Sequence, residues 1–421
     1  VKIFSNALVI DKFSTVAKMI MVIATIGAVY ISMISKDIYD TFKGEFNIMV
    51  LGVLCGGMLL ASANNLLIVY LGVEILSILS YVLASFKRDN TNSNEAGVKY
   101  LLYGGVSAGI MLFGMSHLYG FLGTINFADM ALKINALQGH NLWIVMASFL
   151  LFFVGIGYKI ASVPFHMWSP DVYEGSPIPV TSFFALVPKM AGLAILIRVT
   201  MTFFGDTSPL HVSWVGLLHI IAALTMCVGN ISAIGQESVK RMLAFSSIGH
   251  VGMMLMGVIV MNAVGARDIL FYVFTYIFMT TVAFAITAHV SNQYGTDSNV
   301  AFKGLIYKKP VLAIAMMIAL FSLAGLPPFA GFIAKFNIIS AAVEAGQYGI
   351  ALIAALNSVI ALYYYMYLVK KMVFDQAMSS EGIDSASFKH QFFLAVITLP
   401  IILLGVFWND IMMIADGAKI F

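Results

Sequence analysis

The chain has 421 residues, of which 61% are hydrophobic and only 10% are charged, and its mean hydropathy is +0.94. Soluble domains carry roughly a quarter charged residues, so this composition excludes a water-soluble protein and indicates an integral membrane protein. The net charge of +3 is too small to indicate a nucleic-acid partner. Cys55 and Cys227 lie in apolar runs without disulfide or metal-ligand spacing, and no phosphate loop or haem motif is present, so we expect no bound cofactor or metal.

Hydrophobic runs recur along the whole chain. Because a helix needs about 20 apolar residues to cross a bilayer, they predict an all-α polytopic membrane protein with twelve spans: 14–35, 46–63, 65–86, 96–122, 141–163, 177–204, 209–235, 241–263, 267–291, 310–345, 348–370 and 389–409. The tenth is too long for one crossing, and Pro327 and Pro328 must break it, since proline removes a backbone donor and clashes with the preceding turn. Gly155, Gly157 and Pro164 are expected to interrupt the end of the fifth.

The loops between the predicted spans differ in positive charge. Loops on one face hold 13 Lys and Arg residues, whereas those on the other face hold 7. By the positive-inside rule the first face is cytoplasmic. Both ends of the chain then lie outside, and the segment SVPFHMWSPDVYEG (162–175) lies on the cytoplasmic side.

Five ionisable residues lie near mid-membrane in the predicted spans or beside a predicted helix break. Glu74, Lys189 and His250 lie near the centres of the third, sixth and eighth spans. Lys159 adjoins the break in the fifth, and Lys335 follows the double proline by about two helical turns. Ionisable groups cost several kcal/mol inside the bilayer and are therefore rare and usually functional.

Structural explanations stand beside the functional one. Lys159 could extend its amine to the cytoplasmic interface, and Lys335 could do so if its helix were unbroken. Glu74 and Lys189 lie too far from the helix ends for this, but could form a purely structural buried pair. His250 could be a hydrogen-bonded core residue. Four tyrosines of the eleventh span are interpreted as an interfacial aromatic belt: Tyr363, Tyr364, Tyr365 and Tyr367.

A regular spacing relates the two halves of the chain. Positions 74 and 250, and positions 159 and 335, differ by the same 176 residues. This predicts two five-helix repeats, 46–204 and 209–370, followed by a final span at 389–409. An odd number of spans per repeat inverts the second copy in the membrane. Paired interrupted helices in inverted repeats are a known indication of a transport site.

Three segments carry a family resemblance: PFHMWSPDVYEGSPIPVTSFFALVPKMAG (164–192), VKRMLAFSSIGHVGMM (239–254) and SLAGLPPFAGFIAKF (322–336). They resemble the antiporter-like membrane subunits of respiratory complex I, in particular the N subunits of bacterial NADH–quinone oxidoreductase, which are related to multisubunit sodium/proton antiporter subunits. That family has fourteen helices, so the resemblance implies two more helices before Val1.

The resemblance also implies a function and a setting. Glu74, Lys159, Lys189 and Lys335 match the family's proton relay, with His250 as a further candidate. The chain would be a subunit of the translocase NADH:quinone oxidoreductase in the bacterial inner membrane, with other membrane-arm subunits, the lipid bilayer and protons as its partners. FMN, iron–sulfur clusters and quinone belong to other subunits, so no redox centre is expected here.

The resulting hypothesis is an outward proton relay. Glu74 acts as an electrostatic switch on Lys159, whose proton passes to Lys189 and leaves through Lys335. Arginine could not replace these lysines, because it does not release its proton. Three alternatives remain: a subunit of an independent sodium/proton antiporter, a structural subunit whose charges lock helix packing, and a relative of complex I fed by hydrogenase or ferredoxin.

Overall fold

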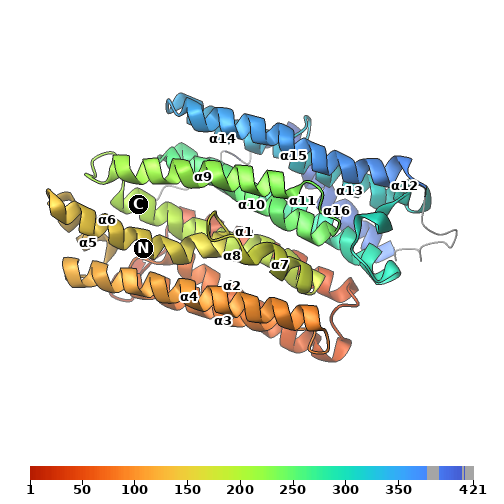
Figure 1. Cartoon of the computed structure of the whole chain (residues 1–421), viewed down its shortest axis with the longest axis horizontal. Helices are drawn as coiled ribbons and strands as arrows, with labels where there is room; N and C mark the ends of the chain where they lie inside the picture. Colours follow the sequence, from red (N-terminus) through yellow and green to blue (C-terminus); the bar gives the residue numbers. More distant parts are fainter. Residues whose placement is uncertain (377–387, 410–411, 413–421) are drawn as a thin grey trace.

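The computed structural model describes residues 1–376, 388–409 and 412. These residues form a bundle of roughly parallel helices (Figure 1), with a two-stranded antiparallel hairpin of β1 (Lys2–Ile3) and β2 (Leu8–Val9) at the beginning of the chain. The helices are α1 (Lys12–Ile34), η1 (Asp40–Phe42), α2 (Lys43–Ser62), α3 (Leu66–Ala84), α4 (Thr91–Leu122), α5 (Phe127–Asn135), α6 (His140–Ile160), α7 (Trp168–Gly175), α8 (Ile178–Phe203), α9 (His211–Ala233), α10 (Val239–Ile259), α11 (Ala263–Tyr294), η2 (Asn299–Phe302), α12 (Leu305–Lys308), α13 (Pro310–Ala324), α14 (Ala330–Glu344), α15 (Tyr348–Phe374) and α16 (Phe388–Val406).

The predicted helical membrane fold is confirmed. Ten helices among the described residues are long and apolar enough to cross a membrane, and α13 and the apolar part of α16 are shorter apolar helices. Each predicted span has a helical counterpart, and the tenth is divided between α13 and α14. At the centre of the bundle lies α8, whose most apolar window is completely buried, whereas only a third of the corresponding window of α4 is buried.

The break in the tenth predicted span lies where the proline pair indicated. Gly325 ends α13 with a φ of +87° and donates its N–H to the carbonyls of Phe321 and Ser322. The connection 325–329 contains both prolines, and α14 begins at Ala330. Glycine adopts this left-handed conformation without the steric cost that a side chain brings. The break is thus specified locally.

The break in the fifth predicted span differs from the expectation. Gly155 and Gly157 lie within α6, whose last residue is Ile160. The next residue, Ala161, caps the helix with a φ of +57°. A Cβ on Gly155 would lie 2.8 Å from the Cβ of Met111 on α4. Small residues let membrane helices approach closely. Gly155 therefore serves packing between α4 and α6, and the interruption consists of residues 161–167.

Corresponding features recur in the two halves of the chain. Helices α4 and α11 each have 32 residues. An isolated β-bridge joins Asn65 to Asn126 just before α3, and a second joins Ser238 to Ser298 just before α10. The short helix α5 lies at one end of the bundle, whereas α12 lies at the other (Figure 1).

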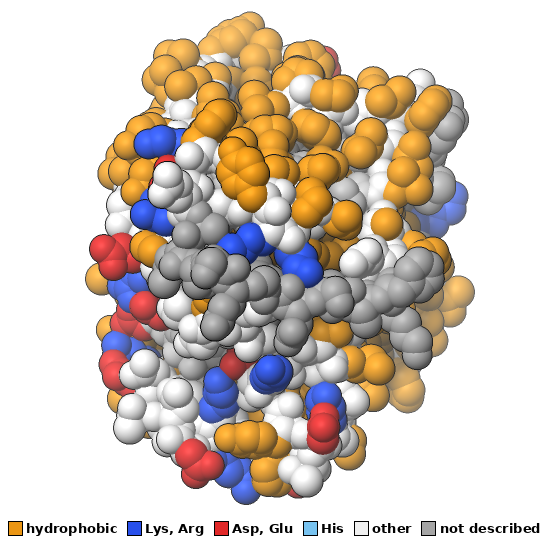
Figure 2. All heavy atoms as spheres, turned by 90° about the vertical axis from the view of Figure 1, so that its right-hand side faces the viewer, with side chains coloured by type: hydrophobic (Ala, Val, Ile, Leu, Met, Phe, Trp, Pro, Cys, Tyr) orange, Lys and Arg blue, Asp and Glu red, His pale blue; other side chains and the backbone are white. Residues whose placement is uncertain are grey.

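One end of the bundle carries most of the charged loops. Figure 2 shows Lys, Arg, Asp and Glu side chains gathered on this end, next to hydrophobic surface. It includes the loops with the larger number of basic residues and the short helix α7. The described loops that the sequence assigns to the more basic face therefore lie at one end of the bundle.

Candidate functional site

Lys159 lies inside the protein at the last turn of α6, with a relative exposure of 2%. Its Nζ faces three tyrosine rings, at 5.4 Å from the centroid of Tyr81, 5.2 Å from Tyr100 and 5.3 Å from Tyr158. Within the described part of the chain this Nζ has no hydrogen-bond partner. Aromatic faces attract ammonium groups through the ring quadrupole. The three tyrosines form an aromatic cage around the amine, which is buried inside the protein.

Glu74 lies on α3 and is partly exposed on the surface of the chain. It interacts electrostatically with Lys159 and with Tyr81 of the aromatic cage. The described residues contain no ion pair between Glu74 and either Lys159 or Lys189. The alternative of a buried structural pair of Glu74 and Lys189 is therefore wrong, and Glu74 acts on Lys159 only through its field.

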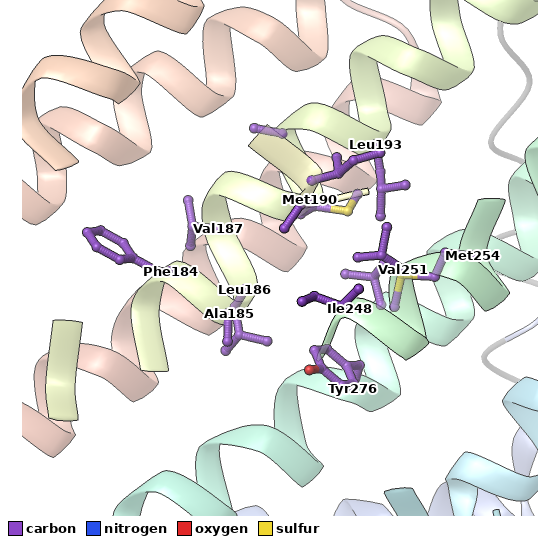
Figure 3. Close-up of a cluster of buried hydrophobic side chains, with 14 of the residues drawn as sticks. Phe184, Ala185, Leu186, Val187, Met190, Leu193, Ile248, Val251, Met254 and Tyr276 are labelled. Atoms are coloured by element: carbon purple, nitrogen blue, oxygen red, sulfur yellow. The ribbon is translucent and has the colours of Figure 1, made fainter. Parts of the chain in front are cut away.

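Lys189 lies near the middle of α8 directly after Pro188 and is almost fully buried. Its Nζ donates to Ser247 Oγ on α10 at 2.7 Å and lies 5.5 Å from the ring centroid of Tyr173 on α7. A small apolar cavity surrounds it, in the seam between α8 and α10. Figure 3 shows Met190 and Leu193 of α8 facing residues of α10 across this seam. The amine is therefore held by one hydroxyl in otherwise apolar surroundings.

His250 occupies a position between two of the lysines. It lines the cavity that contains Lys189 and a second cavity that contains Lys335. Its Nδ1 lies 2.8 Å from the hydroxyl of Tyr272, and its Nε2 lies 3.1 Å from that of Tyr365. It interacts electrostatically with both lysines. His250 is thus a hydrogen-bonded core residue, as one alternative predicted, and it also bridges two titratable sites.

Lys335 is hydrogen-bonded at the helix break itself. Its Nζ donates to the carbonyl of Ala324 at 2.9 Å, and Ala324 is the last residue of α13. The carbonyls at the end of a helix lack intrahelical partners and carry partial negative charge. The side chain packs over Gly325, where an added Cβ would lie 2.9 Å from Lys335 Cδ. The break therefore supplies both the acceptor and the space for this amine, which is buried inside the protein.

Two tyrosines of α15 are part of the site, although the sequence suggested otherwise. Tyr364 and Tyr365 are buried, while Tyr363 and Tyr367 are 61% and 42% exposed, so the aromatic-belt interpretation is wrong for the first two. The Tyr365 hydroxyl is hydrogen-bonded to both Ser246 and His250. Residues 363 and 367 share one helix face, and residues 364 and 365 turn away from it. This periodicity was the signal that could have separated the two pairs.

The Tyr364 hydroxyl extends this polar network toward α9. It donates to Asn230 Oδ1 at 3.1 Å, and Asn230 Nδ2 donates to Asn357 Oδ1 at 3.2 Å. Both asparagines line the cavity that holds His250 and Lys335. Polar side chains from α9, α10 and α15 therefore surround this part of the site.

A further buried cation has a fixed partner. Arg198 on α8 is completely buried and donates to both carboxylate oxygens of Asp11, at 2.8 and 3.2 Å, and to the carbonyl of Ala61. Burial would raise the pKa of Asp11, but the hydrogen bond and charge of Arg198 hold it below its usual value. This pair ties α8 to the beginning of α1. Among the described residues no cluster of His, Cys, Asp and Glu is suited to hold a metal ion.

Comparison with known proteins places the chain in a family. The family model described as "NADH:quinone oxidoreductase/Mrp antiporter, TM" matches residues 63–361. NADH-quinone oxidoreductase subunit N of Trichlorobacter lovleyi is 42% identical over 372 residues, which cover 88% of this chain and 76% of the relative.

Solved structures agree with this. A chain of respiratory complex I from Thermus thermophilus, solved with bound Aureothin, has a TM-score of 0.82 and 30% identity, covering 97% of this chain and 87% of that chain. A chain of the archaeal membrane-bound sulfane sulfur reductase has a TM-score of 0.87 and 25% identity, covering 97% of this chain and 81% of that chain. The chain is a multi-pass protein of the bacterial membrane and belongs to the family of NADH-quinone oxidoreductase N subunits.

Proposed function

We propose that this chain moves protons outward across the membrane, as a membrane-arm subunit of NADH–quinone oxidoreductase. The observation that carries the proposal is the position of His250, which lines the cavities of both Lys189 and Lys335. This position supports a connection inside the bundle between two lysines that lie far apart in the sequence. In this relay Lys159, Lys189, His250 and Lys335 exchange protons, and Glu74 modulates the first of them.

Each step transfers one proton between neighbouring groups. Protonated Lys159 is stabilised by the aromatic cage and by the field of Glu74. When this stabilisation weakens, Lys159 gives its proton to neutral Lys189 and becomes neutral itself. The proton then passes by way of His250 to Lys335, so total charge is conserved at every transfer. Lysine suits this role because its ammonium can lose a proton when buried, whereas arginine stays charged.

Unpaired polar atoms support a hydrated connection between Lys159 and Lys189. The buried hydroxyls of Tyr100 and Tyr173 lack hydrogen-bond partners within the described part of the chain. Tyr100 belongs to the aromatic cage, and the Tyr173 ring faces Lys189. Buried polar groups are normally paired, and internal water is their usual partner where protein groups are absent.

We infer that residues 46–204 and 209–370 are two inverted repeats. The equal lengths of α4 and α11, the matching β-bridges and the two helix interruptions support this division. The positive-inside rule supports a cytoplasmic location for the charged end in Figure 2. Both ends of this chain then face outward, and Lys159 lies nearer the cytoplasm.

The energy for transport must come from other subunits. The relatives are named as parts of NADH-quinone oxidoreductase, in which we expect FMN, iron–sulfur clusters and quinone to be bound outside this chain. Moving one charge outward against 100 mV costs about 2.3 kcal/mol. Quinone reduction is the proposed source, and other membrane-arm subunits are the proposed partners through which it reaches the relay.

The antiporter alternative shares the fold, and the description of the family model names Mrp antiporters as well. The identity of 42% to a protein named subunit N favours the oxidoreductase. The composition of the purified complex separates the two: a redox arm supports the proposal, and an antiporter assembly contradicts it.

The test of the relay is Lys189→Ala in the assembled complex, with Lys36→Ala at an exposed position as the control. Proton uptake and NADH oxidation are measured together in inverted membrane vesicles. We expect Lys189→Ala to lower pumping by about a hundredfold or more, the range for loss of a positioned proton-transfer group. Normal pumping by assembled Lys189→Ala complexes would reject the relay and favour a structural subunit.

A further inference from the structure

The short helix α7 carries none of the proton-carrying groups of the proposed relay, yet it contacts two of the lysine sites. Its eight residues, WSPDVYEG, include both buried aromatic and partly exposed acidic side chains. Trp168 and Tyr173 are buried, whereas Asp171 and Glu174 lie at the charged end of the bundle. The aromatic residues therefore lie in the protein interior, whereas the acidic residues lie near its surface.

The aromatic residues of α7 reach Lys159 and Lys189. The indole of Trp168 stacks on Tyr100 with a centroid distance of 4.4 Å, and its Nε1 donates to the carbonyl of Tyr158 at 2.9 Å. Both of these tyrosines belong to the aromatic cage of Lys159. The Tyr173 ring contacts Lys189. One helix of two turns thus supports the surroundings of both amines.

The acidic residues of α7 are tied to two neighbouring helices. Asp171 accepts from Lys99 of α4 at 2.7 Å and from Arg241 of α10 at 2.9 Å. Arg241 also donates to Glu174 at 2.6 Å. These four residues line a cleft of about 270 Å³. We call these four residues the ion-pair latch; it joins α4 of the first half of the chain to α10 of the second.

Backbone contacts strengthen the attachment at the end of α7. Lys240 Nζ donates to the carbonyls of Glu174 and Ser176, at 2.5 and 3.1 Å. A Cβ on Gly175 would lie 2.4 Å from the carbonyl oxygen of Asn92, so α7 is pressed against the beginning of α4. Because the segment 161–167 before α7 is not helical, these contacts and the latch determine where the helix lies.

We propose that α7 is a positioning element for proton transfer between Lys159 and Lys189, and that the ion-pair latch keeps it in place. Trp168 and Tyr173 are positioning residues, since they act on the lysines through ring contacts. The inference rests on the proposed function and specifies how its first transfer is organised. With the latch broken, the aromatic cage loses the support of Trp168 and Lys189 loses its ring contact, so transfer between the two amines slows.

The test compares Asp171→Asn with Asp171→Glu in the assembled complex. The asparagine removes the charge that binds Lys99 and Arg241, and the glutamate restores it. We expect Asp171→Asn to lower the number of protons pumped per NADH oxidised by about two- to fivefold, the range for one partly exposed ion pair. Asp171→Glu should recover most of this ratio, whereas a merely structural role would lower assembly and leave the ratio unchanged.

Glu45→Gln is the matched control. Glu45 forms an exposed ion pair with Arg88 at the same end of the bundle, at 3.6 Å, without touching α7. The Glu45→Gln variant should leave the number of protons pumped per NADH oxidised unchanged. An equal loss in Glu45→Gln and Asp171→Asn would overturn the proposal, as would a normal ratio in assembled Asp171→Asn complexes.

If Asp171→Asn does not assemble, Trp168→Leu and Trp168→Phe test the same element from its buried face. We expect leucine to lower the ratio and phenylalanine to restore part of it; equal, normal ratios would overturn the proposal. Lys189→Ala is measured alongside. Normal pumping in Lys189→Ala refutes the relay itself, whereas lost pumping there with normal ratios in the α7 variants refutes only the role of α7.

Discussion

The two helix interruptions of this molecule hold their lysines in opposite ways. Lys159 precedes its interruption and faces three tyrosine rings, with no hydrogen-bond partner among the described residues. Lys335 follows its interruption and donates to the carbonyl of Ala324, at the end of the other half of the same span. In the first case the charge is stabilised by tyrosine side chains from its own helix and two neighbouring helices, and in the second by the broken backbone itself.

A helix break can therefore stabilise the surroundings of a buried amine in two ways. At α13 and α14 the break exposes a carbonyl that accepts from the ammonium. At α6 the break separates α7 from the span, so that α7 can pack beside the aromatic cage. An amine that is held by ring faces has no fixed hydrogen-bond acceptor, whereas an amine bound to a carbonyl has one. We therefore expect the two lysines to differ in their response to substitution.

The largest expected effect is that of Lys159→Arg. An arginine keeps the positive charge and still stacks on aromatic rings, so the fold should survive, but it cannot release a proton. We expect pumping to fall by about a hundredfold or more. Proton uptake per NADH oxidised in membrane vesicles measures it, and Lys36→Arg at an exposed position is the control. Normal pumping would show that reversible titration is not the role of Lys159.

A smaller effect is expected from Gly325→Ala at the second break. The residue has φ of +87°, and an added Cβ would lie 2.9 Å from Lys335 Cδ. The backbone strain costs of order 1–3 kcal/mol, which lowers Tm, and displacement of Lys335 should also lower pumping. Purified complex provides Tm, and vesicles provide the pumping ratio.

Gly346→Ala is the matched control for this prediction. Its φ is +74°, and nothing lies within 4 Å of an added Cβ. It should therefore show the loss of Tm without the loss of pumping. Equal pumping in Gly325→Ala and Gly346→Ala would contradict a specific contact between Gly325 and Lys335.

The smallest effect concerns the pH dependence of the ion-pair latch. Burial would raise the pKa of Asp171, but hydrogen bonds and charges of Lys99 and Arg241 hold it below its usual value of about 3.9. A lowered folded-state pKa contributes stability that is present above the unfolded pKa and is lost as the pH falls through the folded one. The same cations also pair with Glu95 and Glu174.

The difference in Tm between the native complex and Asp171→Asn should therefore be constant from about pH 5 to 8. Thermal unfolding of the purified complex across this range measures it. A difference that shrank between pH 7 and 5 would show that the latch titrates near neutrality, and the first break would then contain a pH switch that the second lacks.

Much of the fold could be predicted from sequence because its determinants are local. Span length follows from the thickness of the hydrocarbon core, and the break near Pro327 and Pro328 follows from the missing backbone donor. The rarity of charge in such segments singled out Lys159, Lys189 and Lys335, and the structure places all three amines inside the protein. Composition and periodic hydropathy require no knowledge of neighbouring helices.

The contacts of those residues depend on tertiary packing, because the rotation of each helix about its axis is set by packing against its neighbours. Packing turned Tyr364 inward toward Asn230 and Tyr365 inward toward His250, and it left Tyr363 exposed. Among the described residues it likewise kept Glu74 out of an ion pair with Lys159 or Lys189, surrounded Lys159 with tyrosines from three helices and brought α7 against two lysine sites. Local composition singled out the three lysines that are buried, and packing in the assembled bundle determined their neighbours.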